Sequence, residues 1–168
     1  MNTKRNVLLS LSVMLILAMF SCKNETEKVI DIESEKVAIQ KIIDEHMDAI
    51  DSLDVDRILA VQAEDHLDMP PNMPRIVGKQ AYRDYFTPYV GFFESLKHKE
   101  MSFEIDEFVV SGDWAFQLGK YTTRFVTLDD FEMYDEGNYV WIFKKDDEGK
   151  WKWARVISNS TIPVQAGE

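Results

Sequence analysis

Few side chains in this sequence are arranged for chemistry, and His46 is the clearest of them. It lies four residues after Ile42 and four before Ile50, on the apolar stripe of a predicted helix. Because residues at this spacing share one helix face, the imidazole is expected to point into the interior. There the imidazole either donates a hydrogen bond to a ligand or packs as a core histidine, and the sequence is compatible with both roles.

The remaining reactive residue types show no arrangement typical of a metal centre or a covalent nucleophile. His46, His66 and His98 have no metal-ligand spacing, and the single cysteine excludes an internal disulfide and a cysteine-based zinc site. Neither a Gly-x-Ser-x-Gly motif nor a glycine-rich phosphate loop is present. The acidic segment 129–136 lacks the pattern of a calcium loop and is expected to be solvated. We expect no cofactor and no metal.

The composition is that of an acidic globular domain. The chain has 168 residues, 19 Lys plus Arg against 30 Asp plus Glu, a net charge of −11 and 45% hydrophobic residues. This supplies enough apolar material for one core. An acidic chain without a basic cluster cannot displace phosphate counterions, so nucleic acid is excluded as a partner.

Residues 1–21 have the pattern of an export signal. Lys4 and Arg5 precede a mostly apolar run from position 7 to position 20. As a helix this run would span about 21 Å, which is too short to cross a hydrocarbon core of about 30 Å. It is therefore expected to target the chain for export and not to remain as a membrane span.

Ser21 ends this segment and Cys22 follows it, and the pair resembles the lipobox of bacterial lipoproteins. The resemblance implies that Cys22 becomes the acylated first residue, with chains such as palmitate anchoring the protein to a membrane. Lys23 stands where an Asp would resemble an inner-membrane retention signal, so the outer membrane is favoured. A simple signal peptide with an incidental cysteine is the alternative. Residues 22–33 are polar and acidic and suit a tether.

Residues 34–163 are expected to form the domain, followed by a tail at 164–168. Apolar residues at helical spacing predict a first helix from an N-cap at Ser34 to about Leu53. Asp54 is the predicted cap of a short second helix, and Gly78 opens a third that contains Pro88. Short extended pieces are expected at 66–71 and 75–77.

After these helices the pattern changes to that of strands. The segments 101–110, 114–128, 138–144 and 151–157 are rich in β-branched and aromatic residues and are separated by turn residues. Helices followed by long strands predict an α+β fold with an antiparallel meander.

Both faces of the last two predicted strands carry apolar side chains. Tyr139 and Trp141 alternate with Val140 and Ile142. Helices on one side of the sheet would leave the other side exposed, and a second copy of the chain could cover it. We expect a homodimer.

Several short segments, in this order, resemble the SnoaL-like group of the nuclear-transport-factor-2-like superfamily. They are Ala63–Asp65, Pro70–Lys79, Gly112–Phe116 with Gly119 and Tyr121, Gly149–Lys152, and Asn159-Ser160 with Pro163. The resemblance covers about residues 37–163 and implies a cone-shaped fold with three N-terminal helices packed on a curved, mostly antiparallel sheet. It is weak for function, because this fold hosts isomerases, cyclases, dehydratases and binding modules.

The same resemblance suggests how a reaction could be arranged. In relatives similar to ketosteroid isomerase, a tyrosine that donates to a developing enolate stands at the position of His46. The base stands at about Pro70, which cannot accept a proton, and a second donor corresponds to Tyr139. Asp68 would share the face of Pro70 in an extended strand, so it is the candidate general base. A solvent-exposed carboxylate is the alternative.

The resemblance also bears on the pocket. Relatives with a similar C-terminal segment often carry an Asp and a Trp where this chain has Val156 and Ser158. If these two positions face the cavity, the cavity is roomier and more apolar, but strand alternation alone does not decide which face is inward. The expected lining is His46, Tyr85, Tyr89, Phe93, Tyr121, Tyr139, Trp141, Val156 and Ser158.

Three functions follow from these observations. The first is a membrane-anchored binding or accessory domain for a small apolar or amphipathic ligand, without a reaction of its own. The second is an isomerase, cyclase or dehydratase that uses Asp68 as its base. The third is a dimeric scaffold, which predicts no cavity.

Overall fold

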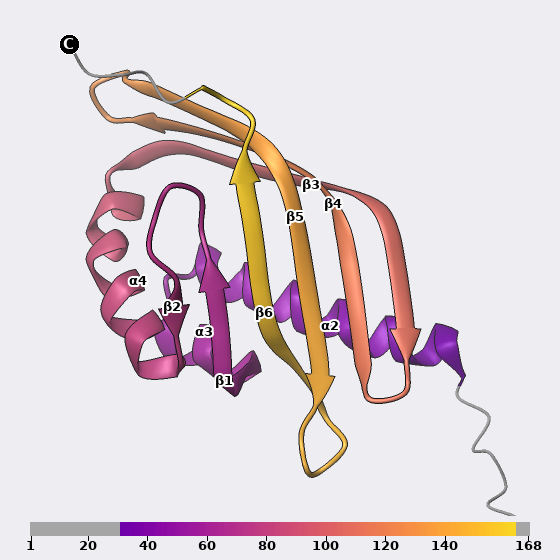
Figure 1. Cartoon of the computed structure of the whole chain (residues 1–168). Coiled ribbons are helices and arrows are strands. Elements are labelled where there is room, and N and C mark those ends of the chain that lie inside the picture. The colour runs from indigo at the N-terminus through magenta and orange to yellow at the C-terminus, as the bar shows by residue number, and fades with distance from the viewer. Residues whose placement is uncertain (1–30, 164–168) are drawn as a thin grey trace, which may run out of the picture. The chain divides into compact units, whose positions relative to one another are not determined.

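Three helices cover one face of a six-stranded sheet in this computed structural model, which describes residues 31–163 (Figure 1). The elements are α2 (Ile32–Asp51), α3 (Val55–Val61), β1 (Gln62–Met69), β2 (Ile76–Val77), α4 (Lys79–Glu94), β3 (Leu96–Ser111), β4 (Trp114–Thr127), β5 (Glu132–Lys145) and β6 (Trp151–Ser160). The strand order is β2-β1-β6-β5-β4-β3, in which only the β1–β6 pair is parallel. The predicted α+β fold, with helices on a curved and mostly antiparallel sheet, is confirmed.

The helix boundaries follow from capping. Helix α2 starts earlier than expected, because the carboxylate of Asp31 accepts the backbone N–H of Ser34 at 3.3 Å and is the N-cap itself. The predicted cap at Ser34 is therefore wrong. Asp54 caps α3 by accepting the N–H of Arg57 at 3.1 Å, and Gly78, at φ 84°, precedes α4. Both of these caps were expected from the sequence.

The strands are longer than the sequence pattern indicated. Strand β1 begins at Gln62 and β3 at Leu96, and the acidic segment 129–136 is mostly strand. The turn between β4 and β5 is short, and β5 starts at Glu132 because the ladder with β4 continues up to it. The expectation of a solvated loop as far as position 136 is therefore corrected.

Two glycines allow the sheet to bend. A Cβ at Gly119 would collide with the backbone carbonyl of Glu104, and one at Gly137 would collide with that of Asn159. A register shift in β3 between Ile105 and Glu107 lies beside the first of these contacts. The far ends of β3, β4 and β5 consequently curl toward α4 (Figure 1).

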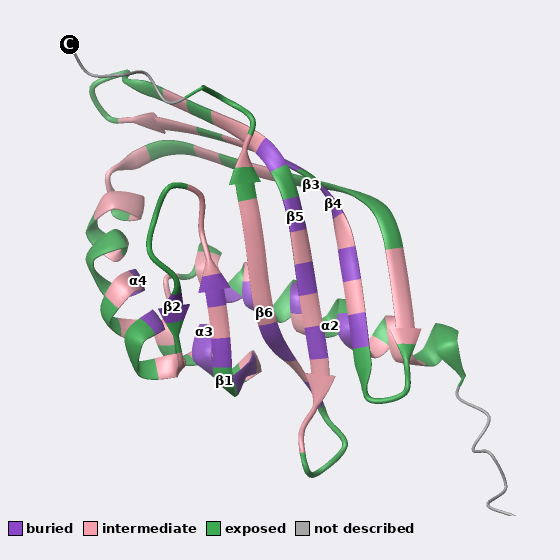
Figure 2. Cartoon of the chain, viewed as in Figure 1, coloured by how far each residue is buried: buried purple, intermediate pink, exposed green. Residues whose placement is uncertain are grey.

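The core consists of two clusters beneath this curved sheet. One packs α2 against the sheet around Ile39, Phe143 and Trp153, and the other joins α3 and α4 around Ile58 and Phe86. Figure 2 shows the buried positions along β1, β4, β5 and β6, on the strands that α2 crosses. None of the helices within residues 31–163 is long and apolar enough to span a membrane.

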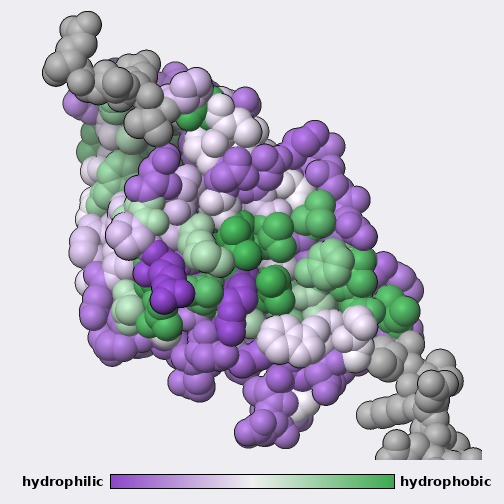
Figure 3. Space-filling model, viewed as in Figure 1, coloured by the Kyte–Doolittle hydropathy of each residue, from purple (hydrophilic) through white to green (hydrophobic). Residues whose placement is uncertain are grey.

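The opposite face of the sheet has no element packed on it within the described residues. Its central side chains are apolar and only half-buried; they are Phe116, Leu118, Val140, Ile142 and Ile157. Trp114 at the end of β4 is half exposed. Figure 3 shows hydrophobic surface gathered over these strands.

Candidate functional site

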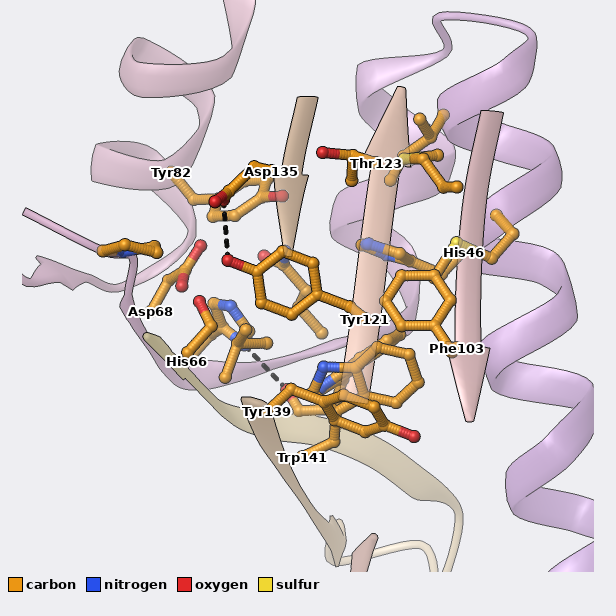
Figure 4. A pocket seen from close by; sticks show the side chains of 18 residues that line it. His46, His66, Asp68, Tyr82, Phe103, Tyr121, Thr123, Asp135, Tyr139 and Trp141 are labelled. Atoms are coloured by element: carbon orange, nitrogen blue, oxygen red, sulfur yellow. Dashed lines mark hydrogen bonds between the residues drawn. The ribbon is translucent and has the colours of Figure 1, made fainter. Parts of the chain in front are cut away.

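A cavity of about 280 Å³ lies between the helices and the concave face of the sheet (Figure 4). Its lining comes from α2, β1, α4 and strands β3 to β6 and is mostly apolar and aromatic. It is formed by His46, Met47, Ile50, Gln62, His66, Asp68, Pro71, Tyr82, Met101, Phe103, Tyr121, Thr123, Asp135, Tyr139, Trp141, Trp153, Val156 and Ser158. The scaffold hypothesis predicted no cavity, and the structure contains one.

The strand register places lining residues from different strands in the same cross-strand rows. Asp68 on β1 is paired with Val156 on β6, which is paired with Trp141 on β5. In the next inward-facing row Ser158 is paired with Tyr139. Seven of the expected residues line the cavity: His46, Asp68, Tyr121, Tyr139, Trp141, Val156 and Ser158.

Three aromatic residues of α4 that were expected in the lining are not part of it. The inward face of α4 is occupied by Tyr82 and Phe86, one helical turn apart. Tyr85 and Tyr89 lie on the adjacent stripe and contact each other, with ring centroids 5.0 Å apart. Phe93 belongs to the second core cluster, where it stacks on Phe86. Helical periodicity alone does not show which stripe of a broad aromatic face meets the cavity.

His46 reaches the cavity from α2, as its spacing predicted. It is 7% exposed, and its ring lies 4.5 Å from that of Trp153, centroid to centroid. Burial, together with the neighbouring His66, lowers the pKa of His46 to about 3, so the imidazole is neutral. Its Nδ1 has no hydrogen-bond partner within the described part of the chain.

His66, which was not predicted, is the second buried imidazole of the lining. It is 1% exposed, and its Nδ1 lies 2.9 Å from the backbone carbonyl oxygen of Trp153. Burial lowers the pKa of His66 to about 4, so the ring is neutral. Since a carbonyl only accepts, Nδ1 carries the proton and Nε2 is a bare acceptor. This Nε2 is buried and has no partner among the described residues.

Asp68 lies two residues after His66 on the same face of β1. It is 8% exposed, and burial raises its pKa to about 6, although a hydrogen bond from the backbone of Met69 partly opposes this. No Lys or Arg within residues 31–163 forms an ion pair with Asp68. Figure 4 shows its carboxylate pointing into the cavity beside His66. The alternative of a solvent-exposed carboxylate is wrong.

A second carboxyl, that of Asp135, borders the cavity from β5. The hydroxyl of Tyr121 donates to it at 2.8 Å, and the hydroxyl of Ser160 donates to its other oxygen. The sequence pattern had placed this residue in a solvated loop, but the β4–β5 ladder pairs it with Thr123. Its two oxygens are thus hydrogen-bonded, whereas Asp68 has no side-chain partner in the described structure.

The lining presents polar groups at defined positions, but it contains only part of the catalytic set that the family resemblance implies. The hydroxyl of Tyr139, the expected second donor, donates to the side-chain oxygen of Gln117 at 3.2 Å. Side-chain atoms of Gln62 and Trp153 are buried without partners in the described region. No group of three or more metal-ligating side chains occurs within residues 31–163.

Comparison with known proteins identifies the domain. A family model described as SnoaL-like domain matches residues 43–154, which is more than half of the chain. The chain belongs to the SnoaL-like family. Within the curated proteins, no sequence matches this SnoaL-like chain.

Solved structures similar to this SnoaL-like chain share its fold at low sequence identity. A ketosteroid isomerase-like protein from Erwinia carotovora atroseptica is 23% identical, with a TM-score of 0.61, 76% of this chain and 96% of that chain covered. A conserved protein from Planctomyces limnophilus is 16% identical, with a TM-score of 0.66 and coverages of 79% and 99%. An NTF2-like protein with a cystatin-like fold from Novosphingobium aromaticivorans is 13% identical, with a TM-score of 0.63 and coverages of 79% and 85%.

The pKa of Asp68 predicts how stability depends on pH. Because burial raises the pKa from its ordinary value of 3.8 to about 6, the folded state favours the protonated carboxyl. The free energy of unfolding should therefore fall as the pH rises through this interval, by roughly 3 kcal/mol at about 1.4 kcal/mol per pKa unit. Asp68→Asn should remove this loss and be more stable than the wild type above the interval and equal to it below.

Urea unfolding of both proteins across the pH range measures this difference. Asp44→Asn, which removes a carboxylate from the exposed side of α2, is the matched control and should leave the pH dependence unchanged. Equal pH dependence in wild type and Asp68→Asn would show that Asp68 is not a buried carboxylate.

Proposed function

We propose that the chain binds a small, mostly apolar molecule in the cavity between α2, α4 and the sheet. The observation that carries this proposal is the combination of an open volume of about 280 Å³ with buried polar atoms that have no partner in the described structure. Unpaired buried polar atoms cost free energy, and a ligand that pairs them recovers part of that cost. Small-molecule pockets have this composition, an apolar wall with a few placed polar groups.

Filling the cavity tests the proposal. Val156 lies in the middle of the lining, so Val156→Trp should occupy the space and lower affinity for lipophilic compounds by at least about tenfold while the chain stays folded. Binding is measured by the shift in melting temperature and by calorimetry with a library of lipophilic compounds.

The matched control changes a valine outside the cavity. Val37 is exposed on α2, and Val37→Trp should leave binding unchanged. If no compound stabilises the wild type, or if Val156→Trp binds as well as the wild type, the cavity is not the binding site.

A second candidate function is an enzyme of the isomerase, cyclase or dehydratase type with Asp68 as general base. Asp68 favours it, because a buried carboxyl with a pKa of about 6 can exchange protons near neutral pH and lines the same cavity as His46 and Tyr139. On this hypothesis Asp68→Asn abolishes turnover of a substrate and leaves its binding in place. Retained turnover in this variant would eliminate Asp68 as the base.

Membrane attachment through Cys22 is part of the proposed function. Cys22 and the export signal lie outside the described residues, and the lipobox-like sequence supports the proposal. We expect an exported protein anchored to the outer membrane by acyl chains, since several chains hold a soluble domain stably. The anchor would keep the binding domain at that membrane.

Cell fractionation tests this attachment. Cys22→Ser should move the protein from the membrane fraction to the soluble fraction, because the acylated thiol is lost. Lys23→Asp keeps the cysteine and should remain membrane-bound but shift to the inner membrane. A Cys22→Ser variant that stays with the membrane would contradict lipidation.

Dimerisation through the open sheet face is also proposed. It is supported by the half-buried apolar side chains of that face and by a shallow apolar groove beside Phe116, Val140 and Ile142. Such a surface is unfavourable in water and resembles the core of a subunit interface.

Ile142→Asp should convert the dimer to a monomer, because it places a charge in the middle of this face. Sedimentation velocity measures the change, and Val37→Asp, on the exposed side of α2, should leave the mass unchanged. A monomeric wild-type protein would refute the proposal.

A further inference from the structure

The polar groups of the cavity are unevenly distributed, and their chemistry restricts the ligand. At one end, β1 presents two acceptors on the same face, Nε2 of His66 and the carboxylate of Asp68. Figure 4 shows the ring and the carboxylate next to each other on one wall. Neither acceptor has a side-chain partner within residues 31–163, so this end of the cavity favours a ligand group that donates hydrogen bonds.

The charges around Asp68 define the sign of that group. Of the titratable groups that share β1 with Asp68, His66 lines the cavity, whereas Glu64 and Asp65 do not. Tyr82 and Tyr85 approach Asp68 from α4, and Asp135 lies across the cavity on β5. None of these is a cation, and the lining formed by the described residues contains no Lys or Arg. An anionic ligand would meet a buried carboxylate with nothing to offset the repulsion, whereas a cation would supply the missing counter-charge.

Two basic side chains that act on His66 from outside the lining are already paired. Lys79 is 2.6 Å from a carboxylate oxygen of Glu64, and Arg155 is 3.1 Å from one of Asp65. Neither Lys79 nor Arg155 lines the cavity, although both charges act on the neighbouring His66 and lower its pKa. The salt bridges and the lining within residues 31–163 therefore provide no cation for Asp68.

The other end of the cavity is an aromatic wall. The ring of Trp141 lies 4.3 Å from that of Tyr139, 4.8 Å from that of Phe103 and 4.7 Å from that of Trp153, centroid to centroid. Trp141 and Asp68 stand in one cross-strand row with Val156 between them, so they are two strand spacings, or about 10 Å, apart. A ligand that reaches both ends has a charged head and an apolar body of about the size of one ring and a short chain.

We propose that the cavity binds a protonated primary or secondary amine with an apolar body, whose N–H groups donate to His66 and Asp68 while the body lies against Trp141. This inference rests on the proposed function, that the cavity holds a small molecule, and names the class of that molecule. Two acceptors distinguish it from a quaternary ammonium ion, which has no N–H to donate. Hydrogen bonds to a charged group are the stronger kind, and the buried setting strengthens them further.

Calorimetric titration of the full chain with three matched probes tests the inference. The probes are phenylpropylamine, its trimethylammonium analogue and phenylpropanol, which share one apolar body and differ in the head group. At about pH 8 the amine is protonated and Asp68 is ionised. We expect the amine to bind at least about tenfold more tightly than the other two probes.

Two variants show whether Asp68 is responsible. Asp68→Asn keeps the shape of the side chain and should reduce the preference of amine over alcohol to less than about twofold. Asp44→Asn removes a carboxylate from the exposed side of α2 and should retain the full preference.

The possible outcomes separate the inference from the proposed function. Equal binding of amine and alcohol, equal binding of the trimethylammonium analogue, or a preference that survives Asp68→Asn would each overturn the amine inference and leave the pocket in place. Failure of all three probes to bind would count against the proposed function and against this inference together. The comparison of probes on the wild-type chain does not depend on the folding of any variant.

Discussion

The close approach of backbones at Gly119 and Gly137 is the constraint on which the rest of this structure depends. Without a side chain at these positions, β4 can approach the backbone of β3 and β5 can approach that of β6. A flat sheet would pack directly on its helices and leave no space. Because this sheet bends, its far half rises over α4 and encloses a cavity large enough for a small molecule (Figure 1).

Strand β1 illustrates how one element serves two environments. Asp65 is paired with Lys144 and Arg155 on the outer side, and the hydrogen bond from Lys144 is the main reason that its pKa is lowered to about 2. Asp68, three residues later, faces the cavity and forms no ion pair within the described part of the chain, and burial raises its pKa to about 6. The same side chain is thus stabilised as an anion at one position and penalised at the other, because only the outer position has cationic partners among the described residues.

The two faces of the sheet carry different surfaces. The inner face carries the pocket, and the outer face carries half-buried apolar residues that include Phe116 and Ile142. Since successive residues of a strand point to opposite faces, the central strands β4, β5 and β6 supply both surfaces. A dimer formed through the outer face would leave the ligand cavity on the helix side of each subunit unobstructed.

The sequence by itself determined the elements and much of the pocket. Hydrophobic spacing placed His46 inward on its helix, and Asp54 and Gly78 marked two helix starts because capping is a local interaction. The family resemblance and the aromatic composition suggested Tyr139, Trp141, Val156 and Ser158 for the lining, and these residues do line the cavity. Strand alternation alone did not decide which face of the strands is the inner one. The family and the fold class could be recognised from the order of the short segments that resemble the SnoaL-like group.

Only the tertiary structure decided which polar groups meet in the cavity. The hydrogen-bond partner of His66 is a backbone carbonyl 87 residues away in the chain. Asp135 borders the cavity because its segment pairs with β4, although the acidic composition of that segment is typical of a loop. In the same way, Tyr85 and Tyr89 lie on one stripe of α4 and Tyr82 on another, and the packing of α4 turns the stripe with Tyr82 toward the cavity. Burial and counter-charge depend on contacts distant in the chain. The burial of Asp68 without an ion pair in the described structure therefore follows from the fold and not from local sequence.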